Sequence, residues 1–235
     1  MKLSEVYKSV QGEGPKVGLP TTFVRFALCN LKCPGWPCDT PHAIFPKQFR
    51  DEWTTIGADA LCELIIEKSY PKANICFTGG EPWLQANGEL KELTTMLWVS
   101  EREMECFTNG SIIIPDWAFD GRMTFVIDCK LEGSGETERS INPEIFRTNL
   151  HRAVDSGVGV LKFTVASHED MAEAMERYDE FQEKIKKHIP VYVGVVWDKV
   201  KEAELVDWML ECELWQWKLN IQTHKHIWPA NARGV

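Results

Sequence analysis

Three cysteines stand close together in the segment from Cys29 to Cys38, whose sequence is CNLKCPGWPC. Three residues separate Cys29 from Cys33, four separate Cys33 from Cys38, and nothing resembling a fourth ligand lies beside them. Iron–sulfur clusters and structural zinc sites usually take four protein ligands. Three thiolates on a four-iron cluster would leave one iron open, and an open iron can hold a substrate or a cofactor. The spacing therefore predicts a cluster that takes part in chemistry.

A zinc site is the alternative interpretation of the same cysteines. Structural zinc sites usually pair their thiolates as Cys-x2-Cys, and neither spacing here is that short. A zinc knuckle completed by a distant Cys or His, in an interaction module without catalysis, is thus a second hypothesis, which metal analysis would separate from the first. The remaining five cysteines are predicted to be small buried hydrophobic residues: Cys62, Cys76, Cys106, Cys129 and Cys212.

A second group of chemically apt residues is Gly79-Gly80-Glu81-Pro82, directly after the apolar run 75–78. Two glycines let the backbone turn sharply and approach a ligand closely. The carboxylate of Glu81 can accept hydrogen bonds from an amine. By itself such a sequence is also an ordinary turn at the end of a strand. Its position one strand after a three-cysteine loop favours a ligand-binding turn.

The elements that must position these loops alternate between two kinds. Short apolar runs rich in β-branched and aromatic residues predict buried strands at 22–28, 74–78, 104–108, 123–127, 160–165, 191–196 and 219–222. Amphipathic patterns predict helices at 58–68, 90–99, 143–154, 168–187 and 199–210. This alternation favours a largely parallel sheet with helices outside it, either barrel-like or open. The segment 36–57, with Pro, Gly and charge, is predicted to be an excursion from that core.

In parallel α/β sheets, ligands bind at the carboxyl ends of the strands. The three-cysteine loop follows the first predicted strand and the glycine turn follows the second. Asn109-Gly110 follows the third strand and Asp128-Cys129-Lys130 the fourth. We therefore expect all four loops to converge on one face.

Composition limits the class of protein. A chain of 235 residues with 44% hydrophobic content can bury one sizeable core, so one domain over 1–235 is the simplest expectation. The net charge of −9 argues against a general affinity for nucleic acids or anionic membranes. No apolar run approaches the roughly 20 residues of a membrane span, and the first residues are too polar for a signal peptide. We expect a cytoplasmic location.

The cysteine loop together with the glycine turn resembles the radical S-adenosylmethionine superfamily. Two further segments narrow the resemblance: Ser9-Val10-Gln11-Gly12-Glu13-Gly14, followed by Arg25, and Gln222-Thr223-His224-Lys225 near the C-terminus. With Cys38-Asp39-Thr40 and Thr78-Gly79-Gly80-Glu81-Pro82, they are similar to the 7-carboxy-7-deazaguanine synthase family. The rival within the superfamily, an activase that places a glycyl radical on a partner protein, gives no account of residues 11–14, Arg25 or His224.

The resemblance implies a fold, a reaction and partners. The fold would be α/β, a shortened, incomplete (β/α) barrel of the radical S-adenosylmethionine type that forms homodimers. The reaction would convert 6-carboxy-5,6,7,8-tetrahydropterin to 7-carboxy-7-deazaguanine with loss of ammonia, a carbon–nitrogen lyase step in queuosine-type 7-deazapurine biosynthesis. An electron donor such as flavodoxin would reduce a [4Fe-4S] cluster, while direct binding to nucleic acid or membrane is not expected.

The resemblance also implies a set of site residues. The cluster would be held by Cys29, Cys33 and Cys38, and Mg²⁺ by Thr40. S-adenosylmethionine would contact Pro37, Cys38, Asp39, Gly80, Glu81, Asp128, Cys129 and Lys130. The pterin would contact Val10, Gln11, Gly12, Arg25, Thr78 and His224, with Gln222 in support. Arg25 suits this role because its planar fork can pair with the carboxylate of the substrate.

The chain departs from the superfamily pattern in the cysteine loop. The usual spacing is Cys-x3-Cys-x2-Cys with an aromatic residue just before the last cysteine. Here four residues, 34–37, fill the second gap, and Pro37 stands where the aromatic is expected. Glycine and two prolines in this gap predict a tight, stiff bulge that returns Cys38 to the cluster. Relatives also often carry Ser-Pro-Lys where this chain has 128–130, so only Lys130 matches there.

Overall fold

The computed structural model describes residues 1–36, 38–85, 88–136 and 141–235. Nine strands form one sheet in the order β3-β1-β2-β4-β5-β6-β7-β8-β9. The strands are β1 (Lys2–Val10), β2 (Pro20–Phe26), β3 (Thr54–Thr55), β4 (Asn74–Gly79), β5 (Met104–Thr108), β6 (Met123–Cys129), β7 (Gly159–Val165), β8 (Val191–Val195) and β9 (Trp217–Leu219). From β2 onward every neighbouring pair is parallel, whereas β1 runs antiparallel to both β2 and β3.

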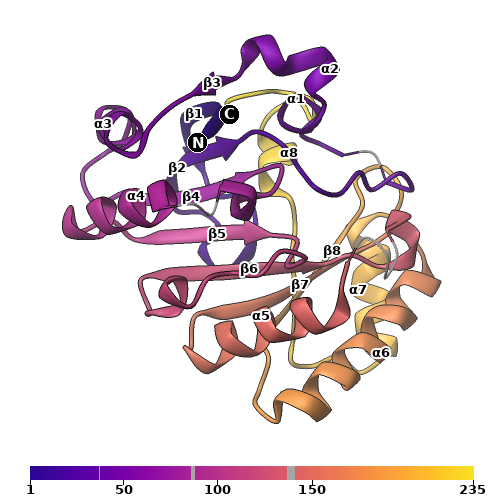
Figure 1. Ribbon diagram of the computed structural model, residues 1–235. Helices are drawn as coiled ribbons and strands as arrows, with labels where there is room; N and C mark the ends of the chain where they lie inside the picture. The colour runs from indigo at the N-terminus through magenta and orange to yellow at the C-terminus, as the bar shows by residue number, and fades with distance from the viewer. Residues whose placement is uncertain (37, 86–87, 137–140) are drawn as a thin grey trace.

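Helices connect these strands. They are α1 (Pro41–Ile44), α2 (Pro46–Phe49), α3 (Ala58–Lys68), α4 (Gly88–Val99), α5 (Pro143–Asp155), α6 (His168–Ile185), α7 (Glu202–Glu211) and α8 (Thr223–Ile227). Helix α3 packs on β1 and β2, α5 on β6 and β7, and α7 on β8, so successive helices follow the sheet across its width (Figure 1). The sheet does not close on itself, because β3 and β9 lie at its two edges. The predicted incomplete (β/α) barrel is confirmed.

Local sequence explains where two of these helices begin. The side chain of Asn142 accepts hydrogen bonds from the backbone amides of Glu144 and Ile145, and Pro143 occupies the first turn of α5. Both features are typical of a helix N-terminus, since the first amides have no partner within the helix. Ser167 caps α6 in the same way, by accepting from the amide of Asp170 at 3.3 Å.

Two sequence expectations were wrong, and the strand at the start of the chain was missed. Strand β1 was not predicted, because KLSEVYKSV mixes charged and apolar residues, as suits a strand with only part of its surface buried. Strand β9 occupies 217–219 instead of 219–222, since Trp217 pairs with Val191 of β8. Cys212 is exposed just after α7, whereas the other four cysteines outside the loop are buried as expected.

The predicted excursion, 36–57, contains α1, α2 and the short edge strand β3 in its described part. Within the part of the chain that the structure describes, no helix is long and apolar enough to cross a membrane.

Candidate active site

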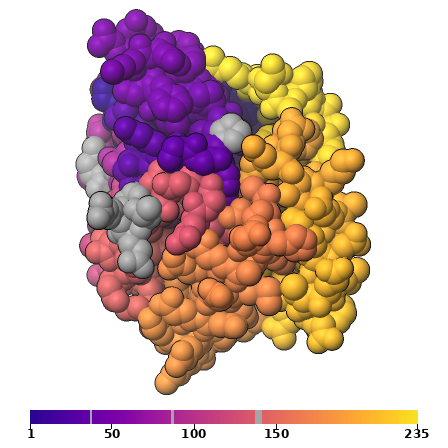
Figure 2. Space-filling view, turned by 90° about the vertical axis from the view of Figure 1, so that its right-hand side faces the viewer, coloured from indigo at the N-terminus to yellow at the C-terminus, as the bar shows by residue number. Residues whose placement is uncertain are grey.

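A cavity of about 660 Å³ opens at the carboxyl ends of the parallel strands. The four predicted loops contribute to its wall, so the expected convergence is confirmed. Figure 2 looks onto this edge, where the purple region of the cysteine loop lies over the salmon middle of the chain and the yellow C-terminal segment lies beside it. Fourteen predicted site residues line the cavity: Val10, Gln11, Gly12, Arg25, Cys29, Cys33, Cys38, Asp39, Thr40, Thr78, Gly80, Asp128, Lys130 and His224.

The cysteine loop forms one wall of this cavity. The Sγ atom of Cys29 accepts hydrogen bonds from the amide of Leu31 at 3.4 Å and from Nδ2 of Asn109 at 3.8 Å. Burial raises the pKa of the Cys29 thiol to about 12 and that of Cys33 to about 11. A buried thiolate at neutral pH therefore needs a cation beside it, which the iron of a cluster supplies when it displaces the proton. This donor set fits a cluster.

The spacing of ligands differs between a cluster and a single ion. Among the residues that the structure describes, no three His, Cys, Asp or Glu side chains lie close enough together to hold one metal ion. A four-iron cluster places each thiolate on a different iron, so its ligands stand farther apart than the ligands of one ion.

The glycine turn lies directly against the end of β2. The amide of Gly80 donates to the carbonyl of Phe26 at 3.1 Å, and the amide of Glu81 donates to that of Leu28 at 2.8 Å. A β-carbon at Gly80 would come within 1.9 Å of the Leu28 oxygen, and Gly79 has a φ of 128°. Only glycine fits this approach. The turn therefore presents bare backbone to the cavity beside the first cysteine.

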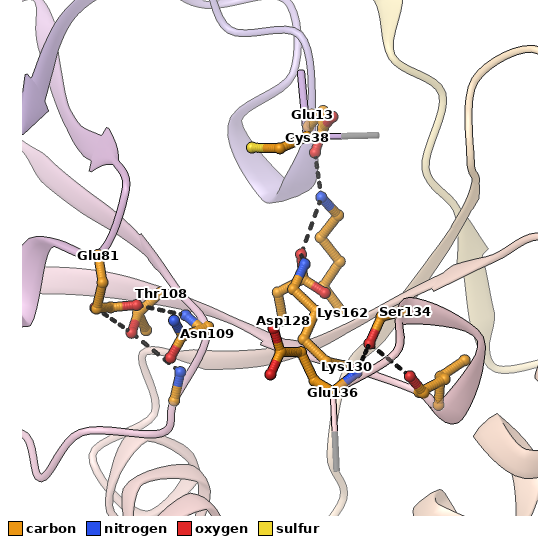
Figure 3. A network of polar contacts seen from close by, with 12 residues as sticks. Glu13, Cys38, Glu81, Thr108, Asn109, Asp128, Lys130, Ser134, Glu136 and Lys162 are labelled. Carbon is orange, nitrogen blue, oxygen red and sulfur yellow. Dashed lines mark hydrogen bonds and ion pairs between the residues drawn. The ribbon is translucent and has the colours of Figure 1, made fainter. Parts of the chain in front are cut away.

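Two residues that were predicted to contact the cofactor have buried side chains that do not line the cavity. Glu81 has no exposed surface and does not line the cavity. Its oxygens accept hydrogen bonds from the hydroxyl of Thr108 and the amide of Asn109, both at 2.8 Å (Figure 3). They also accept from the amide of Trp83 at 3.1 Å. It ties the glycine turn to the end of β5. Burial raises its pKa to about 7 despite these donors.

Cys129 is the second of these two residues. Its side chain is buried and does not line the cavity, because alternate residues of a strand face opposite sides and Asp128 and Lys130 face the cavity. Pro37, also predicted to contact the cofactor, lies outside the described residues.

Segments from near the two ends of the chain meet in the wall of the cavity. The amide of Thr223 donates to the carbonyl of Gly12 at 3.1 Å. A β-carbon at Gly12 would lie 2.2 Å from Nδ1 of His224, so the imidazole packs directly on the glycine backbone. Burial lowers the pKa of His224, which keeps the ring neutral at pH 7. A neutral imidazole can both donate and accept a hydrogen bond.

Arg25 reaches the cavity from β2 with its guanidinium held by two partners. Its Nε donates to Glu5 at 2.7 Å and its Nη2 donates to the hydroxyl of Tyr7 at 2.6 Å. The partners raise the pKa of Arg25, although burial opposes them. Despite burial, the pKa of Glu5 falls to about 2, because His42 and Arg25 both bond to its carboxylate. The fork is thus fixed in orientation before any ligand arrives.

The cavity wall contains a row of ion-paired side chains that was not predicted from the sequence. Nζ of Lys162 donates to Glu13 at 2.5 Å and lies 3.7 Å from Asp128, which also accepts from Lys130 at 2.9 Å. Figure 3 shows Lys162 between the two carboxylates. Gln222 donates to the other oxygen of Glu13 at 2.6 Å. The cation holds the pKa of Glu13 near 2, against the effect of burial. One signal was present in the sequence: Lys162 is the only charge in the apolar run VLKFTV.

Comparison with known proteins agrees with this geometry. The chain is 32% identical to the 7-carboxy-7-deazaguanine synthase of Clostridium acetobutylicum over 235 residues, which covers all of this chain and 99% of that protein. It belongs to the 7-carboxy-7-deazaguanine synthase family. The synthase of Leptospira interrogans is 29% identical over 98% of this chain and 96% of its own length. The chain is accordingly an enzyme of this family, although no family model matches it.

A solved structure shares the fold of this family member. QueE from Escherichia coli matches with a TM-score of 0.68 at 21% identity, over 93% of this chain and 92% of that one. At such identity the likeness shows the fold alone.

Proposed function

We propose that the protein converts 6-carboxy-5,6,7,8-tetrahydropterin to 7-carboxy-7-deazaguanine and ammonia by radical S-adenosylmethionine chemistry. One observation carries the proposal beyond family membership. The three loop cysteines and the residues expected to hold the pterin, which come from opposite ends of the chain, line a single cavity. A radical generated at a cluster in that cavity would form beside its substrate.

Each cofactor is assigned to the part of the cavity wall whose residues would hold it. Cys29, Cys33 and Cys38 would hold a [4Fe-4S] cluster. S-adenosylmethionine would be held by the bare backbone at Gly80 together with Asp128 and Lys130. Bound there, the cluster and S-adenosylmethionine would supply the one-electron radical chemistry that the reaction needs.

The remaining wall would hold the pterin. Arg25 presents a guanidinium already oriented by Glu5 and Tyr7, so it would bind the substrate carboxylate at little further cost in side-chain entropy. The neutral ring of His224 would contact the heterocycle over Gly12. An unpaired carboxylate at Glu13 would repel the carboxylate of the substrate. Because Lys162 neutralises Glu13, this part of the wall presents a fixed, paired set of charges instead.

Three further expectations belong to this proposal. Thr40, which lines the cavity 3.5 Å from the sulfur of Cys38, would bind Mg²⁺ together with the substrate carboxylate. A donor such as flavodoxin would dock near the cysteine loop, where Lys32 and Gly35 are exposed. The chain would act as one domain over 1–235 and as a homodimer.

The test uses protein reconstituted with iron and sulfide without oxygen. We expect conversion of the tetrahydropterin only when reductant and S-adenosylmethionine are both present, and faster turnover with Mg²⁺ than without it. Cys38→Ala should abolish turnover, while Cys212→Ala, at an exposed cysteine outside the cavity, should not change it. Full activity of Cys38→Ala would refute the assignment, and a zinc-loaded, iron-free protein would favour the zinc module.

A further inference from the structure

The long second gap of the cysteine loop rests on a segment far along the chain, the turn 132–136 after β6. The amide of Gly35 donates to the carbonyl of Ser134 at 2.9 Å. A β-carbon at Gly35 would lie 2.1 Å from the oxygen of Gly133, and one at Gly135 would lie 2.6 Å from the ring of Pro34. The two segments therefore fit backbone to backbone, with glycines at the points of contact.

A single carboxylate joins the same two segments at the middle cysteine. One oxygen of Glu136, Oε1, accepts hydrogen bonds from the amides of both Lys32 and Cys33, each at 2.6 Å. Cys33 has a φ of 44°, in the left-handed region. Consecutive amides around such a residue turn toward one side and form a concavity that binds anions. Here the anion is the buried side chain of Glu136, which is 9% exposed.

The position of Glu136 is itself fixed. Its amide donates to the hydroxyl of Ser134 at 3.2 Å, and that hydroxyl donates to the carbonyl of Leu131 at 2.6 Å (Figure 3). Ser134 is fully buried. The carboxylate thus reaches the cysteine loop from a braced turn, and the loop conformation around Cys33 depends on a residue 103 positions away in the sequence.

We propose that Glu136 is a positioning residue for the iron–sulfur cluster: it fixes the turn at Cys33 and sets the local charge that the cluster experiences. The inference rests on the proposed cluster. Hydrogen bonds from loop amides to cluster sulfurs stabilise the reduced cluster, and a nearby negative charge destabilises it. The carboxylate of Glu136 would make the cluster harder to reduce in two ways. It occupies the amides of Lys32 and Cys33, which could otherwise donate to cluster sulfurs, and it adds a negative charge nearby.

Three substitutions separate the two parts of this role. Glu136→Gln keeps an oxygen of the same reach and loses the charge, so the reduction potential should become less negative while iron content stays at about four per chain. Glu136→Asp keeps the charge but is one methylene shorter. Glu136→Ala loses both acceptor and charge. The last two should lose the turn, and with it iron, to a similar extent.

The experiment measures two properties besides activity. Hydrogen–deuterium exchange across 30–36 in the iron-free protein measures directly whether the amides of Lys32 and Cys33 are protected by hydrogen bonds. Iron content and potentiometric titration followed by electron paramagnetic resonance report the cluster. Glu132→Ala, at an exposed carboxylate in the same turn, is the matched control and should resemble wild type in both.

We expect exchange across 30–36 to rise at least tenfold in Glu136→Ala and to stay near wild type in Glu136→Gln. Unchanged exchange, iron content and potential in Glu136→Ala would overturn the positioning role. Wild-type protein that takes up no iron would instead refute the proposed cluster, while the exchange data on iron-free protein would still decide whether Glu136 fixes the loop. If Glu136→Ala does not fold, the potential of Glu136→Gln decides: a value equal to wild type contradicts the proposal.

Discussion

The ion pair between Lys162 and Glu13 offers a quantitative test of how the cavity wall is stabilised. Both side chains are buried, with a separation of 2.5 Å between Nζ and Oε2. Lys162→Met keeps much of the volume of the side chain and removes the cation. The buried carboxylate of Glu13 then keeps, among the residues that the structure describes, only Gln222 as a hydrogen-bond partner from a side chain.

The magnitude follows from the pKa of Glu13. Its fall from 4.5 to about 2 corresponds to about 3 kcal/mol at roughly 1.4 kcal/mol per tenfold change in acid strength. Breaking a buried pair by removing one partner typically costs about 3–5 kcal/mol. We therefore expect Lys162→Met to lower the free energy of unfolding by about 3 kcal/mol at pH 7.

The dependence on pH has a definite sign. Because the pKa of Glu13 is lower in the folded protein than in the unfolded chain, its stabilisation is complete above pH 4.5 and disappears as pH falls through about 2. The difference between wild type and Lys162→Met should therefore shrink as the pH falls below 4.5.

Urea unfolding, followed by tryptophan fluorescence under reducing conditions, measures both effects. Lys184→Met is the matched control, because Lys184 pairs with Glu180 at 2.7 Å on the exposed surface of α6 and should contribute less than about 1 kcal/mol. The double variant Glu13→Gln/Lys162→Met should recover part of the loss, since no unpaired charge remains. A loss below 1 kcal/mol at pH 7, or a loss that does not change with pH, would refute the reasoning.

Two further predictions concern the glycine backbone and the buried acid. In Gly12→Ala the new methyl would meet the ring of His224 and displace it, at a cost of about 1–3 kcal/mol, which should raise KM for the tetrahydropterin about tenfold or more. The control is Gly88→Ala, because a methyl there meets nothing within 4 Å. Equal KM values in the two variants would contradict the contact. Because the pKa of Glu81 is raised to about 7, the free energy of unfolding should decline as pH rises from 4.5 through 7. Glu81→Gln should remove up to about 3 kcal/mol of that decline between pH 5 and pH 8. Urea unfolding at these two pH values measures the decline, and parallel declines in wild type and variant would exclude Glu81 as its cause.

Much of the site was predictable because parallel strands bring their carboxyl ends to one edge. Cys29, Gly80 and Lys130 follow three different strands, and their convergence needs only the strand order. The sequence also shows which residues can do chemistry, but not which way each one faces. Glu81 belongs to the right motif, yet its carboxylate turns inward to brace β5, because backbone donors there would otherwise be buried without partners.

Contacts between distant segments were beyond prediction for another reason. Lys162 and Glu13 are 149 residues apart, and Glu136 and Cys33 are 103 apart. No local periodicity relates such pairs, because they are set by loop paths after the strands are in place. The four-residue second gap of the cysteine loop showed that the loop departs from the common spacing. Only the structure shows that the turn 132–136 accommodates it.

The contact between Gly12 and the segment at Thr223 has a consequence for the order of assembly. These residues lie 211 positions apart, so the pocket wall that they form closes a very long loop. Closing long loops early costs conformational entropy that few other contacts repay, and such contacts form late in folding. As the chain emerges from the ribosome, the cysteine loop and the glycine turn are complete well before helix α8 exists. Loading of the proposed cluster and closure of the proposed substrate pocket can therefore be separate events, with the segment at Thr223 joining Gly12 in the later one.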